Sequence, residues 1–231
     1  MANTAILAGL SNSGKSTSMR YLDPESTFIV SCTNKQLQIP GFRKKYPKVS
    51  IVDNKLTGNW LVSNQYNQIE KVLTAVSKTR PEIKTIVIDD VNYLLSAETF
   101  SNALVKGYEK FSVLAKNYYD LIEHCQGLRD DLMVVFISHV ENYGTELDPM
   151  YRIWTTGKML TSQINLDGLF SYIIYSERAI DDTSGEIIYR FKTRTDGNDT
   201  CRSVQGCFEE KYIEPNLKYV VDTINKFENG D

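Results

Sequence analysis

The segment Gly9-Leu10-Ser11-Asn12-Ser13-Gly14-Lys15-Ser16 stands close to the start of this 231-residue chain and fits the pattern G-x-x-x-x-G-K-[ST] without departure. Apolar residues 5–8 precede it and predict a buried strand, and residues 16–22 after it are expected to open a helix. A glycine-rich loop between a strand and a helix is the setting of a phosphate-binding P-loop, in which backbone N–H groups point at one anion. The segment therefore predicts a nucleotide phosphate site.

Each residue type in this loop suits a separate task. Gly9 and Gly14 are expected to adopt positive φ and to let the backbone approach a phosphate, because they carry no Cβ. Lys15 would reach the β- and γ-phosphates, and the Ser16 hydroxyl would ligate Mg²⁺. The predicted nucleotide-binding set is Gly9, Ser11, Asn12, Ser13, Gly14, Lys15, Ser16 and Thr17. The alternative is a Gly-Ser turn before an ordinary helix.

Length and composition favour one α/β domain over residues 1–231, since single domains of this class reach about 200–250 residues. The net charge of -3 excludes a strongly basic nucleic-acid module, so that any nucleic-acid site must be local or built by oligomerisation. The four cysteines contain no C-x-x-C pair, which argues against a zinc site or a disulfide framework. The N-terminus lacks the basic and apolar regions of a signal peptide, and no run of 18 apolar residues occurs. We therefore expect a cytoplasmic protein that does not bind membranes.

A second informative stretch begins at residue 85, where β-branched residues 85–88 run directly into Asp89 and Asp90. A buried parallel strand delivers the residue that follows it to the sheet edge where open α/β sheets place their ligands. Asp89 is predicted to hold Mg²⁺, and Asp90 to polarise the attacking water as a general base. The alternative is a strand that ends in an acidic turn.

The most apolar strand of the chain is expected at residues 132–137, and the polar residues Ser138 and His139 follow it. Many P-loop ATPases place a polar residue at this point that reaches toward the γ-phosphate. Ser138 and His139 are therefore candidate sensors of the γ-phosphate. The alternative is a histidine that only satisfies a local hydrogen bond.

A long connection, residues 141–168, separates that strand from the next one, and aromatic and cationic residues are interleaved in it. Bases stack on rings while cations track phosphates, so this composition suits a single-stranded DNA site. The candidate residues are Tyr151, Arg152, Trp154 and Lys158. A structured surface loop with buried aromatics would produce the same composition.

Residues 186–194 alternate apolar and polar side chains, as a half-exposed edge strand does, after a hairpin turn. Its outward face carries Arg190, Lys192 and Arg194, of which Lys192 and Arg194 are candidate fingers that reach the phosphate of a neighbouring subunit. These charges would also keep an edge strand from aggregating. Amphipathic helices are expected at residues 65–78, at 96–126 as one long helix, and after Pro215.

Three classes of P-loop protein compete. A GTPase would need a D-x-x-G switch, and residues 89–92 lack its glycine. A nucleotide or nucleoside kinase would need an Arg-rich lid, for which only Arg152 and Lys158 are available. An ATPase of the additional-strand type fits best, because two strands with polar tips follow the P-loop at a distance. A scaffold gated by ATP with little hydrolysis is a further alternative.

The order of these motifs resembles phage-encoded RecA-like nucleotide-binding proteins, the AAA/RecA-type ATPases that include single-strand annealing relatives. The resemblance rests on residues 9–16, 86–90 and 134–141, on Asp167 before a Tyr-rich strand, and on residues 208–217. It implies a RecA-like P-loop NTPase core with a mostly parallel sheet flanked by helices and an antiparallel C-terminal hairpin. It also implies ATP with Mg²⁺, a homo-oligomeric ring or filament, and single-stranded DNA binding in recombination or replication. By this resemblance, His139 is the residue that falls where RecA-type proteins place a sensor of the γ-phosphate. No glutamate follows the P-loop helix at the usual place, which leaves the base role with Asp90 or unassigned.

Overall fold

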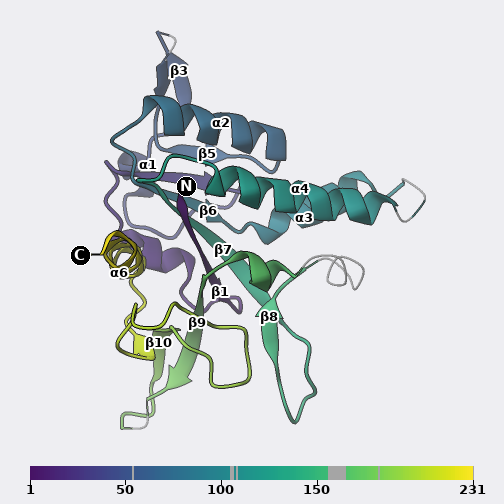
Figure 1. The fold of residues 1–231 in the computed structure, drawn as a ribbon, viewed down its shortest axis with the longest axis vertical. Helices are drawn as coiled ribbons and strands as arrows, with labels where there is room; N and C mark the ends of the chain where they lie inside the picture. The colour runs from purple at the N-terminus through teal and green to yellow at the C-terminus, as the bar shows by residue number, and fades with distance from the viewer. Residues whose placement is uncertain (54, 105–106, 108, 156–164, 182, 231) are drawn as a thin grey trace.

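The computed structural model describes residues 1–53, 55–104, 107, 109–155, 165–181 and 183–230. Its central feature is a nine-stranded sheet with the order β11-β10-β9-β1-β7-β6-β2-β5, to which β8 adds beside β7 (Figure 1). The strands from β9 to β5 are parallel, whereas β10 and β11 form an antiparallel edge. The strands of this sheet are β1 (Asn3–Gly9), β2 (Thr27–Ser31), β5 (Trp60–Val62), β6 (Thr85–Asp89), β7 (Met133–Asn142), β8 (Tyr151–Ile153), β9 (Tyr172–Ile180), β10 (Ile187–Lys192) and β11 (Tyr212–Ile213).

Helices cover both faces of the sheet, so the fold is α/β with an antiparallel C-terminal edge, as expected. One face carries α2 (Tyr66–Thr79), α3 (Asn92–Ser101) and α4 (Glu109–Gln126). The other carries α1 (Phe42–Lys45), α6 (Leu217–Asn229) and a 3₁₀ helix, η1 (Ser16–Tyr21). Smaller elements are a hairpin of β3 (Ser50–Val52) with β4 (Lys55–Thr57), and the 3₁₀ helix η2 (Leu166–Leu169). None of the described helices is long and apolar enough to cross a membrane.

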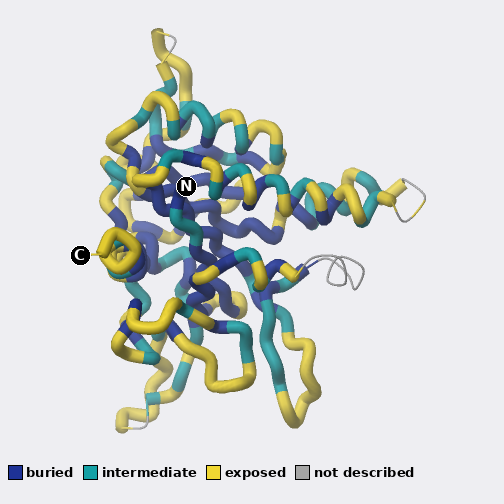
Figure 2. The backbone as a smooth tube through the Cα atoms, viewed as in Figure 1, coloured by how far each residue is buried: buried dark blue, intermediate teal, exposed yellow. Residues whose placement is uncertain are grey.

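The strands at the centre of the sheet are buried on both faces (Figure 2). Successive side chains of a strand point to opposite faces, and β1 shows the result. Ile6 and Ala8 join the apolar cluster under α2, α3 and α4, whereas Ala5 and Leu7 join the cluster under η1 and α6. This two-sided burial explains why the parallel strands are continuous apolar runs in the sequence.

The prediction of one long helix at residues 96–126 is wrong, because the structure has two helices in this region, α3 and α4. Gly107 lies between them with a φ of +103°, a conformation that a right-handed helix cannot contain. In the sequence, the apolar residues Phe100, Leu104 and Phe111 keep near-helical spacing across the break between the two helices. The periodicity alone therefore did not reveal the break.

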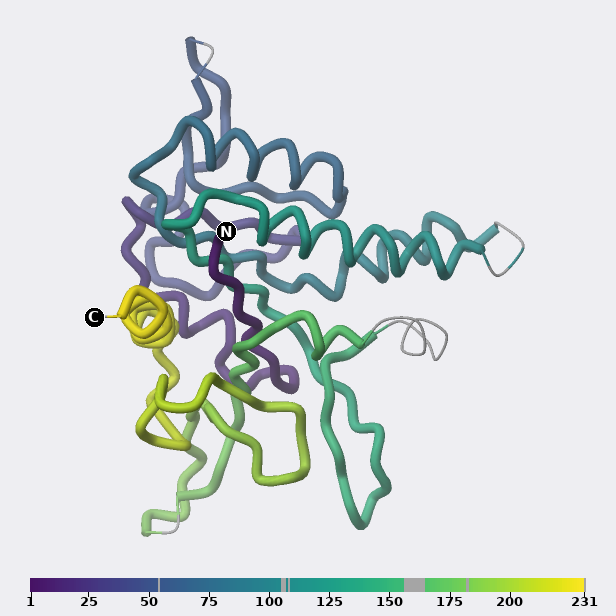
Figure 3. Tube along the Cα trace, in the orientation of Figure 1, coloured from purple at the N-terminus to yellow at the C-terminus, as the bar shows by residue number. Residues whose placement is uncertain are grey.

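The strand expected to end at residue 137 continues to Asn142 and turns back into β8. Figure 3 shows this β7–β8 hairpin leaving the body of the molecule as a long arm. Val140 of β7 pairs with Ile153 of β8, and both are buried. Ser138 and Val140 are buried while His139 and Glu141 are half-buried, so this segment alternates as a strand does and is not a loop. The connection expected over residues 141–168 is therefore partly a hairpin.

Gly9 ends β1 where β9 passes closest. A Cβ on Gly9 would lie 2.3 Å from the carbonyl oxygen of Ser176 and 2.8 Å from Oγ of Ser13. The expected positive φ at Gly9 is wrong: in the loop, positive φ occurs at Asn12 (60°) and Gly14 (95°). Gly9 is thus required for close strand packing.

We predict that Gly9→Ala lowers the free energy of unfolding by about 1–3 kcal/mol, because the added methyl overpacks a backbone contact that cannot move freely. Urea unfolding followed by circular dichroism measures the change. Gly127→Ala is the matched control, since its Cβ would meet the nearest atoms at an ordinary 3.5 Å. Equal stability of the two variants would contradict the packing role of Gly9.

Candidate nucleotide-binding site

A cleft of about 520 Å³ lies at the carboxyl end of β1, against the P-loop. Ligands of open α/β sheets bind outside this edge, because the carboxyl ends of parallel strands and the loops that follow them meet there. The described residues that line the cleft are Ser11, Asn12, Ser13, Gly14, Lys15, Ser16, Thr17, Ser18, Arg20, Lys35, Gln36, Leu37, Gln38, Asp90, Tyr93, His139, Tyr189 and Pro215. Seven of the eight residues in the predicted nucleotide-binding set thus line one cavity, and the eighth, Gly9, accepts a hydrogen bond from Lys15.

Lys15 is buried at the base of the cleft. Its Nζ donates hydrogen bonds of 2.8 Å to the carbonyl oxygens of Gly9 and Leu10. Burial lowers the pKa of Lys15 to about 8, although the charges of Asp90 and Asp89 oppose the shift. A buried ammonium that the protein compensates only in part favours the approach of an anion such as a phosphate.

Ser16 and Asp89 meet beside Lys15, with Oγ of Ser16 donating to Oδ1 of Asp89 at 2.9 Å. Burial raises the pKa of Asp89 to about 7, and the neighbouring charge of Asp90 adds to the shift. Hydroxyl and carboxylate oxygens are donors that Mg²⁺ prefers, and a cation would compensate this buried carboxylate. No group of three or more His, Cys, Asp or Glu residues suited to a metal occurs in the described chain. The pair fits Mg²⁺ only if phosphate and water supply its other ligands.

Asp90 follows Asp89 in a left-handed turn, with a φ of 59°. Its Oδ1 lies 3.5 Å from Nε2 of His139. Burial alone would raise the pKa of Asp90, but the hydrogen bond from His139 and the charges of Lys35 and Lys15 lower it overall. Asp90 is therefore an anion at neutral pH and faces the cleft together with His139. The structure thus brings the predicted base and the predicted sensor side by side.

Asn92 is a buried residue of this region that the sequence did not single out. Its Oδ1 accepts hydrogen bonds from Oγ of Ser138 at 2.9 Å and from the backbone N–H of His139 at 2.6 Å. Its Nδ2 donates to the carbonyl oxygen of Trp154 at 3.0 Å. One amide side chain therefore connects the start of α3 to β7 and to the residue that follows β8. An asparagine at a helix start is common as a cap, so the sequence carries no signal for this role.

Lys35 and Tyr189 also line the cleft, and neither was predicted as a site residue. Lys35 lies in the loop after β2, and Tyr189 lies on β10 at the antiparallel edge of the sheet. Only the order of strands brings these two distant segments to the P-loop, which explains why spacing in the sequence did not reveal them.

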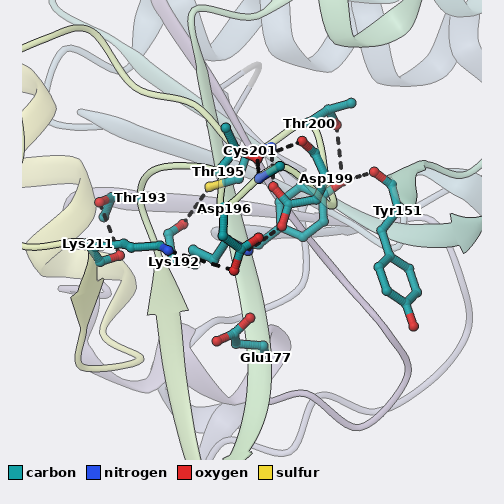
Figure 4. A network of polar contacts seen from close by, with 12 residues as sticks. Tyr151, Glu177, Lys192, Thr193, Thr195, Asp196, Asp199, Thr200, Cys201 and Lys211 are labelled. Atoms are coloured by element: carbon teal, nitrogen blue, oxygen red, sulfur yellow. Dashed lines mark hydrogen bonds and ion pairs between the residues drawn. The ribbon is translucent and has the colours of Figure 1, made fainter. Parts of the chain in front are cut away.

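The prediction that Lys192 is a finger is wrong, because its side chain is buried and not presented to a neighbouring subunit. Its Nζ forms an ion pair of 2.7 Å with Asp196 and a second one with Asp199 (Figure 4). The expected alternation of buried and exposed side chains fails at this end of the strand. β10 ends at Lys192 and the following loop covers its side chain, so that Phe191 and Lys192 are both buried.

Arg190 on β10 and Arg194, two residues beyond its end, have partners as well. Arg190 pairs with Glu177 at 2.6 Å and lies over the ring of Tyr212. Arg194 is exposed, and its Nη2 donates to the carbonyl oxygen of Glu209 at 2.9 Å. Its role as a finger stays a prediction.

The predicted DNA-binding residues lie on and after β8. Nε of Arg152 donates to Oε1 of Glu141 at 2.8 Å, and its guanidinium lies over the ring of Tyr143. Tyr151 and Trp154 are half-buried, and the backbone N–H of Trp154 donates to the carbonyl oxygen of His139 at 2.9 Å. Lys158 lies outside the described residues. The charge of Arg152 is thus partly compensated by Glu141, while Trp154 is hydrogen-bonded directly to the predicted sensor.

The chain matches no model of a known protein family, and a comparison with curated proteins found no match either.

We predict that Asn92→Ala lowers the free energy of unfolding by about 1–3 kcal/mol, because buried polar groups of Ser138, His139 and Trp154 lose their partner. Chemical denaturation measures the loss. Asn67→Ala, at an exposed position of α2, should change stability by less than about 0.5 kcal/mol. If the two variants unfold at the same denaturant concentration, Asn92 does not have the connecting role described above.

Proposed function

We propose that this protein is a Mg²⁺-dependent ATP-binding protein and ATPase with a RecA-like core. The observation that carries the proposal is the meeting of Lys15, Ser16 and Asp89 beside the cleft that Lys15 and Ser16 line, with 2.9 Å between Oγ of Ser16 and Oδ1 of Asp89. A lysine for phosphates beside a hydroxyl and a carboxylate for Mg²⁺ is the set that P-loop NTPases require.

The strand order supports the additional-strand type of ATPase over a kinase or a GTPase. β7 lies between β1, which carries the P-loop, and β6, which carries Asp89. Its pairing with β1 places Gly9 opposite His139, so a polar residue of the inserted strand reaches the phosphate end of the cleft. This is the position expected of a residue that senses the γ-phosphate.

Each residue then has a defined part in hydrolysis. Lys15 and the loop N–H groups would bind and orient the β- and γ-phosphates, while Ser16 and Asp89 would hold Mg²⁺. The bound metal ion would supply positive charge for the phosphate oxygens. Asp90 is anionic and would orient a water for attack on the γ-phosphate, with His139 fixing the carboxylate. Both lie on the side of the P-loop toward β6.

The biological setting that we propose is DNA recombination or replication of a phage, with single-stranded DNA, in the cytoplasm of the host cell. The resemblance to RecA-like phage proteins supports it. So does the hydrogen bond from Trp154 to His139, because it joins a candidate DNA-binding segment to a candidate nucleotide sensor. A homo-oligomer would bring Arg194 of one subunit toward the cleft of the next.

A second candidate function is a scaffold that binds ATP and scarcely hydrolyses it. Asp90 is the one carboxylate among the described residues that line the cleft, and its lowered pKa makes it a weak proton acceptor. ATP binding would then organise the protein without turnover.

We predict that Lys15→Ala reduces ATP turnover by at least about tenfold, since it removes a charge-assisted contact to the transferred phosphate. Phosphate release is measured with and without single-stranded DNA, and DNA is expected to increase the turnover of the wild type. Lys44→Ala, at an exposed position of α1, is the control for loss of a surface charge.

Three results would change the proposal. Turnover that is equal in wild type and Lys15→Ala under both conditions rejects the ATPase and, if ATP still binds to the wild type, favours the scaffold. A lack of DNA binding and of stimulation rejects the recombination setting alone. Transfer of the γ-phosphate to a nucleoside or nucleotide in an acceptor screen would identify a kinase.

A further inference from the structure

The cleft is chemically different on the two sides of the P-loop, and the difference implies a direction for the nucleotide. We propose that the nucleotide lies along the carboxyl edge of the sheet with its terminal phosphate at Lys35 and its base against Tyr189. This inference rests on the proposed nucleotide-binding function and adds which way the ligand lies and which residues bind its two ends.

The sheet order places the two residues on opposite sides of β1. β10, which carries Tyr189, is two strands away on one side, whereas β2, which leads to Lys35, is three strands away on the other. Asp89 and Asp90 lie on the Lys35 side, at the end of β6. Because the carboxylate that would hold Mg²⁺ belongs at the β- and γ-phosphates, the terminal phosphate must point toward Lys35.

Lys35 is held close to this end by the residues around it. The N–H of Cys32 donates to the carbonyl oxygen of Asp89 at 3.0 Å, and both Cys32 and Leu37 are buried. Lys35 itself is exposed between these anchors and lines the cleft. Within the part of the chain that the structure describes, it has no hydrogen bond or ion pair.

The charge of Lys35 supports the same position. Lys35 lines the cleft together with Asp90, which follows Asp89 at the end of β6. A cation in this cleft that has no hydrogen bond or ion pair within the described chain remains available for a phosphate oxygen. Lys35 is thus a phosphate-binding cation of the subunit that carries the P-loop, separate from any finger of a neighbour.

Tyr189 reaches the other end because β9 extends past the P-loop. Tyr175 of β9 pairs with Ala8 near the end of β1, and β9 continues to Ile180. β10 returns along this extension, where Tyr189 pairs with Arg178. Tyr189 is 43% exposed, and its ring lies 3.4 Å from where a Cβ on Gly14 would stand. An aromatic face is therefore accessible directly beside the loop.

The accessible ring of Tyr189 beside the loop suits recognition of the face of a base. Every base has a π-face, so stacking alone discriminates weakly between bases. We therefore expect ATP and GTP to bind with affinities within about tenfold of each other.

Isothermal titration of ATP, ADP and tripolyphosphate in Mg²⁺ tests this direction with the purified full chain. Lys35→Gln should lower the affinity for ATP and for tripolyphosphate about tenfold and leave the affinity for ADP unchanged, because ADP lacks the terminal phosphate. Tyr189→Ala should lower the affinity for ATP and for ADP about tenfold and leave the affinity for tripolyphosphate unchanged, because tripolyphosphate lacks a base. The two variants thus have opposite expected patterns over the three ligands.

Two variants serve as controls, Lys44→Gln for loss of an exposed charge and Tyr189→Phe, which keeps the ring and should bind like the wild type. The inference is overturned if Tyr189→Ala weakens tripolyphosphate as much as ATP, or if Lys35→Gln weakens ADP as much as ATP. It is also overturned if neither variant changes the affinity for ATP. In these cases the nucleotide-binding function survives, provided that ATP binds to the wild type and not to Lys15→Ala. If the wild type binds none of the three ligands, the function and the inference both fail.

Discussion

The parallel pairing of β1 with β7 is the interaction on which the site depends. Seven consecutive residue pairs set its register, and the last of them places Gly9 opposite His139. β6 pairs on the far side of β7, so that Asp89 ends its strand at the same edge. A slip of one residue would turn every side chain of β7 to the other face and remove both the packing and the polar end. The core and the cleft therefore share one constraint.

Two charged side chains at the cleft are buried at a cost in free energy. Burial raises the pKa of Asp89 and lowers the pKa of Lys15, so that it disfavours the charged form of each. The two side chains lack the compensation that a well-paired buried ion pair has, since Asp89 bonds to Ser16 and Lys15 to backbone carbonyls. A ligand that brings both an anion and a cation relieves both costs together. Binding should therefore stabilise the protein by more than its contacts alone suggest.

Several parts of this structure could be predicted from the sequence, because they depend on local patterns. The glycine-rich loop of residues 9–16 is one contiguous motif, and Asp89 and the pair Ser138-His139 follow apolar runs whose carboxyl ends must meet in a parallel sheet. Asn92, Lys35 and Tyr189 could not be predicted, since strand order and register alone bring them to the site. The exposure of Lys192 was predicted wrongly for a related reason. The alternation of buried and exposed side chains assumes that a strand continues, but β10 ends at Lys192, where a loop covers this side chain.

The β7–β8 hairpin has a mechanical consequence. His139 lies within β7, and the same hydrogen-bonded strand continues into the arm without an intervening loop. Asn92 holds the backbone of this strand at His139 and holds Trp154 on the returning side. A paired ladder resists bending far more than a loop does, so a small tilt of β7 at the cleft would swing the whole arm about that point. The hairpin is thus a lever whose short end lies at the candidate nucleotide site and whose long end lies in the solvent.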